Sequence, residues 1–158
     1  MSDLRIRHDD LRDPRIEQFM LEHLADMHAT SPPESVHALD MDGLRRPEIS
    51  FFTGWLAGPD GDALVATGAL KRLDAQRAEL KSMRTRATVR GQGLGRQMLL
   101  HLLAQAKALG IQQLLLETGT HPFFDPAVQL YHRHGFSDCG PFDGYTLDPN
   151  SRYMTRWV

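Results

Sequence analysis

The 158-residue sequence lacks several features that would place it in a specialised class of protein. Its single cysteine, Cys139, cannot form a disulfide within the chain. It contains no apolar run of about 18 residues, the length of a membrane-spanning helix. Net charge is also small, because 18 Lys and Arg stand against 20 Asp and Glu, for a formal charge of −2. We therefore expect neither a membrane nor a nucleic-acid partner.

The composition is that of a folded protein with one core. Hydrophobic residues make up 41% and charged residues 24%, which favours a globular chain over a disordered one. A chain of this length normally forms one domain, so we predict a single domain over residues 1–158. The first residues, Met-Ser-Asp-Leu-Arg, lack the apolar segment of a secretion signal. Together with the lone cysteine, this predicts a cytoplasmic protein.

The hydrophobic pattern along the chain alternates between strand and helix periods. It predicts strands at 4–8, 49–56, 64–71, 77–83, 111–117, 136–145 and 153–158, and helices at 14–30, 31–44, 94–109 and 126–133. This order predicts a mixed α/β fold with helices on both faces of a twisted sheet. The crossover from 77–83 through the helix at 94–109 to 111–117 predicts a parallel, right-handed connection.

A glycine-rich segment precedes the helix at 94–109, with the sequence Arg90-Gly91-Gln92-Gly93-Leu94-Gly95-Arg96. Backbone N–H groups at a helix start attract phosphate, and the glycines leave room for it while Arg90 and Arg96 add positive charge. The spacing matches neither a dinucleotide-binding fingerprint nor a Walker A loop. The segment alone therefore leaves two interpretations open, a simple turn or a phosphate cradle.

Two motifs carry a resemblance to a known family. The segment 90–95 resembles the R-x-x-G-x-G/A pyrophosphate loop of the Gcn5-related N-acetyltransferase (GNAT) superfamily, and Leu130-Tyr131-His132-Arg133-His134-Gly135-Phe136 resembles its L-Y-x-x-x-G-F segment. The predicted element order also resembles that fold over the whole chain. Shorter segments at 31–39, 79–83, 116–119 and 141–142 resemble a group of small bacterial acetyltransferases. The resemblance implies the GNAT fold, a mixed, mostly antiparallel twisted sheet of about seven strands with about four helices on both faces.

The resemblance also implies acetyl-CoA as co-substrate and assigns residues to it. The N–H groups of 92–96 would hold the pyrophosphate, and the strand ending at Thr85 would pair with the pantetheine arm and part from its neighbour, which opens a cleft for the thioester. Backbone near Met83 and Arg84 would polarise the acetyl carbonyl. The cofactor-binding residues predicted in this way are Met83, Arg84, Thr85, Arg90, Gly91, Gln92, Gly93, Leu94, Gly95 and Arg96.

Two residues are candidates for proton transfer. Tyr131 corresponds to the family tyrosine that protonates the departing thiolate, although a core tyrosine at a helix end is the alternative. Alternation places Arg77, Glu79, Lys81 and Met83 on one strand face. Glu79 is then either the base, acting directly or through a water, or a partner of Lys81 in a structural network.

One position departs from the family pattern. Many members carry an asparagine seven residues before the tyrosine, and here Phe124 stands there. Contact with the cofactor at this point must therefore be apolar or be made elsewhere.

Acceptor specificity in the superfamily comes from the first helix pair and the last strands. Acidic and aromatic side chains there suit a cationic amine, namely His28, Glu34, His37, Glu117, Asp143 and Tyr145. Solvated or capping roles are the alternative, and Ser31 with Glu34 has the spacing of a capping box. His132 and His134 lack a third ligand at useful spacing, so we expect no metal site.

These expectations combine into one function and one alternative. The chain is expected to be an acetyl-CoA-dependent N-acetyltransferase that moves an acetyl group to a primary amine of a small molecule or peptide by direct transfer in a ternary complex. The alternative is a catalytically weak CoA-binding sensor or interaction module. An exposed edge strand near the C-terminus leaves a homodimer open.

Overall fold

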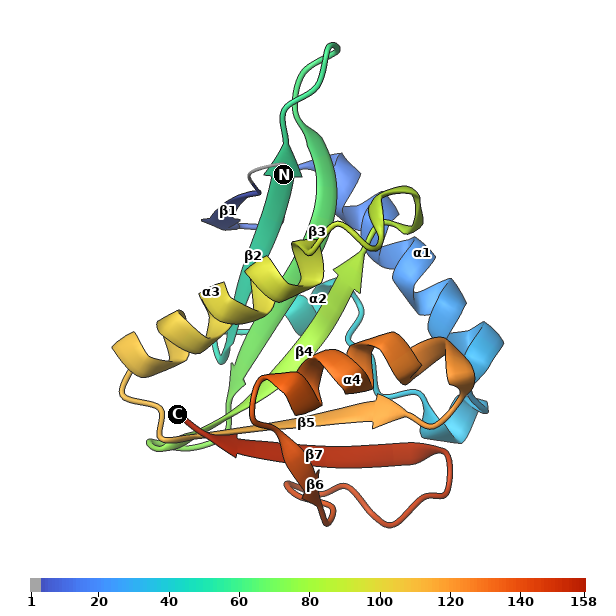
Figure 1. The fold of residues 1–158 in the computed structure, drawn as a ribbon, viewed down its shortest axis with the longest axis vertical. Helices are drawn as coiled ribbons and strands as arrows, with labels where there is room; N and C mark the ends of the chain where they lie inside the picture. The colour runs from blue at the N-terminus through green and yellow to red at the C-terminus, as the bar shows by residue number, and fades with distance from the viewer. Residues whose placement is uncertain (1–3) are drawn as a thin grey trace.

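The computed structural model describes residues 4–158, in which seven strands form one sheet in the order β1-β2-β3-β4-β5-β7-β6 (Figure 1). The strands are β1 (Arg5–His8), β2 (Ile49–Leu56), β3 (Ala63–Arg72), β4 (Arg77–Thr85), β5 (Gln113–Gly119), β6 (Ser137–Cys139) and β7 (Ser151–Trp157). Among these residues β4 and β5 are parallel, and the other neighbouring strands pair antiparallel. The predicted mixed, mostly antiparallel sheet is confirmed.

In the part of the chain that the structure describes, four helices cover the two faces of the sheet. They are α1 (Pro14–Thr30), α2 (Met41–Leu44), α3 (Leu94–Ala108) and α4 (Asp125–Arg133), with short 3₁₀ turns at η1 (Pro33–Ser35), η2 (Ala87–Val89) and η3 (Pro122–Phe124). Helices α3 and α4 lie on one face, and α1 and α2 on the other (Figure 1). No helix within residues 4–158 is long and apolar enough to cross a membrane.

Two predicted elements are wrong. The segment expected as a helix at 31–44 forms η1, an extended stretch and the single turn of α2, whose cap is Asp40. Pro32 and Pro33 disfavour helical backbone before them, and the Ser35 hydroxyl donates to Asp148 (2.5 Å), which ties the segment to a distant loop. The strand expected at 136–145 is limited to Ser137–Cys139; Gly140 and Pro141 follow outside the sheet, where proline has no N–H for strand pairing, and the chain then turns at Asp143 and Gly144, both with positive φ.

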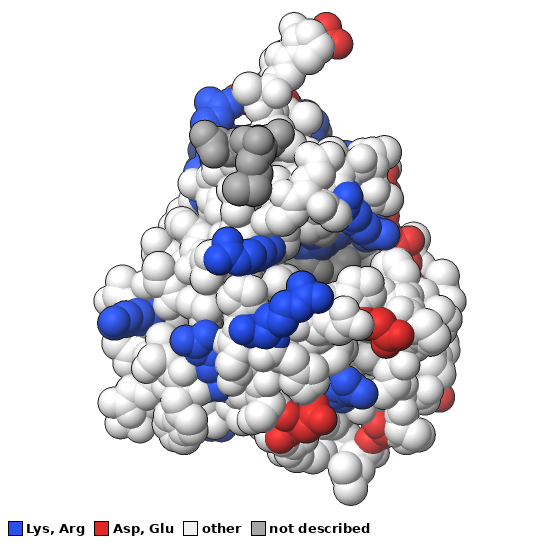
Figure 2. Space-filling model, viewed as in Figure 1, with Lys and Arg blue, Asp and Glu red and all other residues white. Residues whose placement is uncertain are grey.

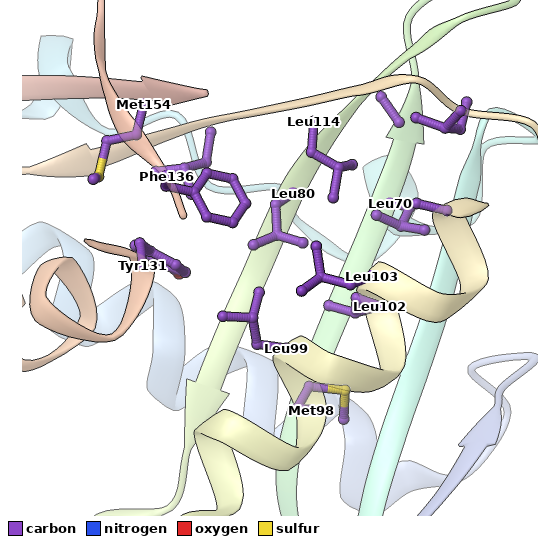
Figure 3. Close-up of a cluster of buried hydrophobic side chains, with 14 of the residues drawn as sticks. Leu70, Leu80, Met98, Leu99, Leu102, Leu103, Leu114, Tyr131, Phe136 and Met154 are labelled. Atoms are coloured by element: carbon purple, nitrogen blue, oxygen red, sulfur yellow. The ribbon is translucent and has the colours of Figure 1, made fainter. Parts of the chain in front are cut away.

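The main core lies between the sheet and the α3–α4 layer (Figure 3). Met98, Leu99 and Leu102 of α3 pack over Leu80 of β4. Gly68 of β3 lets α3 approach closely, since a Cβ there would lie 2.7 Å from Leu102. Burial of each such leucine contributes about 2 kcal/mol to stability. This packing fixes the start of α3 beside the end of β4.

Candidate active site

The two parallel strands separate part-way along their length (Figure 1). Their pairing runs from Arg77–Gln113 to Leu80–Leu116, although β4 continues to Thr85 and β5 to Gly119. Beyond the fork β4 stays paired to β3, and β5 stays paired to β7. The separation that the resemblance implied is therefore present in the fold.

A cavity of about 840 Å³ occupies the fork. Its walls come from β4, β5, the glycine loop, η3 and α4, and on the other side of the sheet from α1 and the segment 31–38. The lining includes four arginines, Arg84, Arg90, Arg96 and Arg133. Figure 2 shows Lys and Arg side chains bordering a hollow on the α3–α4 face. A long ligand with an anionic end fits this shape and charge.

A β-bulge changes the side-chain pattern of β4 inside the cavity. The register with β3 shifts between Thr67 and Ala69, and Ser82 adopts φ 55°. Met83 therefore packs with the core on the α3 side, whereas Glu79 and Lys81 face the opposite side. The prediction that Met83 shares the face of Glu79 is wrong, because strict alternation ignores the extra residue of a bulge.

The glycine loop presents free backbone donors to the cavity. The N–H groups of 91–96 have no hydrogen-bond acceptor within residues 4–158, whereas the Gln97 N–H bonds the Gly93 carbonyl (3.1 Å). Gly91 and Gly93 have φ of 82° and 77°, a conformation that favours glycine, and a Cβ at either would meet no atom within 4 Å. All the predicted cofactor residues except Gln92 line the cavity. The loop has the geometry of a diphosphate cradle.

Phe124 forms an apolar wall of the same cavity. Its ring is buried against Gly119 at the end of β5, where any Cβ would overlap it. The guanidinium of Arg90 lies 5.5 Å from the neighbouring Phe123 ring. At the position where many family members carry an asparagine, this chain therefore offers apolar contact.

Tyr131 lines the cavity from α4 and is 5% exposed. Its ring packs edge-on against Phe136 at 5.6 Å, and its hydroxyl has no hydrogen-bond partner among residues 4–158. Burial raises the pKa of this hydroxyl above its ordinary value, which keeps the proton on the oxygen. The residue therefore combines core packing with a free, protonated hydroxyl.

Glu79 is held in a buried network. Its Oε2 atom accepts hydrogen bonds from the Tyr145 hydroxyl (2.6 Å) and from Lys81 Nζ (3.1 Å), and Lys81 Nζ also donates to the Tyr145 oxygen (3.1 Å). The Glu79 and Lys81 side chains are 2% and 9% exposed. Burial and the Glu79 carboxylate raise the pKa of Tyr145, so this hydroxyl stays a donor. The contacts match the structural network that the sequence left open.

The other predicted acceptor residues divide into two groups. Glu117 and His37 line the cavity on the Glu79 side of the sheet, and the His37 ring contacts Tyr145 edge-on at 4.9 Å. Burial raises the pKa of Glu117 to about 7 and, together with Lys81, lowers that of His37. The cavity lining does not include His28, Glu34 or Asp143. Tyr145 is also outside the lining, but its hydroxyl bonds Glu79, which is part of the lining.

Sequence reasoning missed an ion pair that holds the lining residue Arg84 against a half-exposed carboxylate of α1. Arg84 Nη1 donates to Asp26 Oδ2 of α1 (2.7 Å), and Arg84 lies over the Phe19 ring. His23, one turn before Asp26, is buried, and its pKa falls to about 4 through burial and the Arg84 charge. The helical spacing of His23 and Asp26 was readable, but their contact with β4 depends on the tertiary fold.

Comparison with known proteins gives a consistent result. The acetyltransferase (GNAT) family model matches residues 16–136. The chain belongs to the GNAT family. It is 44% identical over 153 residues to the Bacillus subtilis (strain 168) uncharacterized N-acetyltransferase YsnE, covering 97% of this chain and 99% of that protein. It is 43% identical over 150 residues to the Escherichia coli (strain K12) uncharacterized N-acetyltransferase YedL, covering 95% and 92%.

The fold of this GNAT protein also matches solved structures. A Bacillus subtilis acetyltransferase in complex with CoA superposes with a TM-score of 0.66 at 18% identity, covering 99% of both chains. This likeness concerns the fold. With the family match and the named relatives, the GNAT protein is an acetyltransferase.

Proposed function

We propose that this GNAT protein transfers an acetyl group from acetyl-CoA to a primary amine of a small molecule or peptide, with both substrates bound at once. The observation that carries the proposal is the opening of the β4–β5 fork beside the free N–H groups of 91–96, within one cavity. One end of the cavity suits a diphosphate, and the fork leads from it through the plane of the sheet.

The α3–α4 side of the cavity is proposed to bind acetyl-CoA, which supplies an activated thioester. The N–H groups of 92–96 hold the diphosphate, and Arg90 and Arg96 add positive charge. Within residues 4–158 the β4 backbone beyond Leu80 has no partner strand on the β5 side, so it can bond the pantetheine amides. Phe124 gives that arm an apolar contact.

Tyr131 is the proposed proton donor. When the C–S bond breaks, the thiolate requires a proton, and a buried hydroxyl with a raised pKa still carries one at neutral pH. Its free hydroxyl and its place in the lining support this role. The intact Y-x-x-x-G-F spacing supports it independently.

The amine is proposed to enter from the opposite side of the sheet. There the lining comes from α1, from the segment 31–38, and from Glu79, Lys81 and Glu117. An ammonium group finds carboxylates there but no arginine cluster like that of the glycine loop. A primary amine is therefore the acceptor that the charges favour.

Two measurements test the proposal. Calorimetry measures acetyl-CoA binding, and a thiol reagent measures CoA release in the presence of primary amines that include diamines, amino acids and short peptides. We expect binding together with amine-dependent release. Binding without release for any amine would instead favour the sensor alternative, and absence of binding would overturn the assignment of the glycine loop.

A further inference from the structure

Glu117 occupies a specific position at the fork. The parallel register pairs Glu79 with Leu115, so the next residues on the same face are Lys81 and Glu117. Pairing ends at Leu80–Leu116, between these two levels. Glu117 is therefore the first β5 side chain on the acceptor side of the sheet beyond the point where the strands part, and it lines the cavity.

The two acidic residues of the acceptor side differ in how they are engaged. Glu79 accepts two hydrogen bonds and pairs with Lys81. Glu117 forms no ion pair within the described part of the chain. A base needs a lone pair available to the substrate, and Glu117, which lines the cavity and contacts the Ser151 hydroxyl rather than a cation, meets that requirement better than the ion-paired Glu79.

The surroundings of Glu117 favour proton exchange near neutral pH. Burial is the main cause that raises its pKa to about 7. The charged and titratable groups that face it are Glu79 and Lys81 from β4, Tyr153 from β7, and Tyr145 and Asp148 from the loop before β7. The Ser151 hydroxyl, through a hydrogen bond, and the Lys81 charge lower the pKa, whereas Glu79 and Asp148 raise it. A base with a pKa near the working pH transfers protons efficiently.

We propose that the Glu117 carboxylate accepts the proton of the acceptor ammonium group, and that Glu79 is a positioning residue that holds Lys81 and Tyr145 in place. This inference rests on the proposed acetyl transfer. It changes the identity of the base from the β4 carboxylate to the β5 carboxylate and leaves Tyr131 as donor to sulfur.

The proton and bond changes balance. The ammonium gives one proton to Glu117, and its nitrogen lone pair then forms the N–C bond to the acetyl carbon. The C–S bond breaks, and its electrons remain on sulfur, which takes the Tyr131 proton. The nitrogen releases its second proton, which restores the Tyr131 hydroxyl, and Glu117 returns its proton to water. The products are the amide, free CoA and one proton.

The test compares Glu117→Gln with Glu79→Gln, using the amine that gives the fastest CoA release. At saturating acetyl-CoA, kcat/KM for the amine is measured from about pH 5.5 to about pH 9.5. In the wild type we expect a rise through about pH 7, in line with the pKa of Glu117. Glu117→Gln should lose that inflection and fall by about 10²-fold or more, with acetyl-CoA affinity unchanged.

The charge neighbours give a second readout that a purely structural Glu117 would not produce. Glu79→Gln should keep the inflection and move it to lower pH, because a negative neighbour is removed. Lys81→Met should move it to higher pH, because a positive neighbour is removed.

The possible failures can be told apart. A Glu117→Gln enzyme that keeps the inflection and loses less than about threefold in kcat/KM would overturn the inference while the transferase proposal stands. A wild type that binds acetyl-CoA but acetylates no amine would overturn the transferase proposal and this inference with it. If Glu117→Gln does not fold, the Glu79→Gln and Lys81→Met shifts decide the question, and unmoved inflections in both would overturn the inference.

Discussion

The buried network of Glu79, Lys81 and Tyr145 makes a strong prediction about stability. Glu79→Gln replaces a carboxylate that is 2% exposed with an uncharged side chain of nearly the same shape. Lys81 Nζ lies 3.1 Å from Oε2, and at an effective dielectric constant of about 20 the attraction across this distance is about 5 kcal/mol. The variant leaves Lys81 buried without its counter-charge.

The expected cost follows from that uncompensated charge. Removing one member of a buried ion pair typically lowers the free energy of unfolding by about 3–5 kcal/mol. Adding Lys81→Met removes the stranded charge, so the double variant should be more stable than Glu79→Gln alone. This reversal occurs only if the two side chains depend on each other.

Urea denaturation at neutral pH, followed by circular dichroism, measures all four members of this cycle. The two single variants and the double variant are compared with the wild type at the same denaturant slope. A Glu79→Gln loss below about 1 kcal/mol, or a double variant whose loss equals the sum of the single losses, would refute the reasoning. Either result would mean that Glu79 is free for another role.

Three further predictions concern the site. Gly93→Glu should abolish acetyl-CoA binding in calorimetry without unfolding the protein, because it places bulk and negative charge in the cradle at φ 77°; retained affinity would remove the loop assignment. Tyr131→Phe should lower kcat by roughly 10²-fold and barely change acetyl-CoA affinity; unchanged turnover would return Tyr131 to a packing role. Folded Glu117 keeps its proton up to about pH 7, whereas its ordinary pKa is 4.5, so between these values the free energy of unfolding should fall as pH rises. Across that window the free energy of unfolding of the wild type should fall by up to about 3 kcal/mol relative to that of Glu117→Gln. Urea denaturation at about pH 4.5 and at about pH 8 measures this difference, and an equal difference between the two proteins at both pH values would contradict the prediction.

The sequence predicted most of the fold, because the hydrophobic residues of each helix and strand recur at the spacing typical of that element. The Asp13–Pro14 signal begins α1, and the apolar stripe of α3 ends at Gly110, as expected from capping and turn chemistry. The helix prediction for 31–44 was wrong because it used local signals alone. Ser31 and Glu34 have the spacing of a helix cap, but the segment is held instead by the Ser35–Asp148 hydrogen bond, which joins residues 113 positions apart.

The candidate site was predictable in its loop and less so in its acids. The glycine spacing predicted 90–96 as a candidate phosphate loop, and Gly91 and Gly93 adopt the positive φ that glycine favours. The role of Glu79 stayed open because its decisive partner, Tyr145, is 66 residues away and arrives on a loop. Glu117 was predicted as a substrate-binding residue, but its burial, and the lack of an ion pair to it among residues 4–158, depend on the final packing.

The fork itself follows from constraints on both strands. On β4, the bulge at Ser82 turns Met83 into the core and anchors the strand to β3, and the Thr67 hydroxyl bonds the Ser82 carbonyl (2.8 Å). On β5, the Phe124 ring fills the space at Gly119, while β7 pairs with that strand to its end. Each strand therefore has a partner strand on its outer side, β3 for β4 and β7 for β5, so β4 and β5 can stay apart beyond Leu80–Leu116 while each keeps one hydrogen-bonded edge. A Cβ at Gly119 would lie 2.2 Å from the Phe124 ring, so a side chain there would force this ring, which lines the cavity, to move and would change the cavity wall.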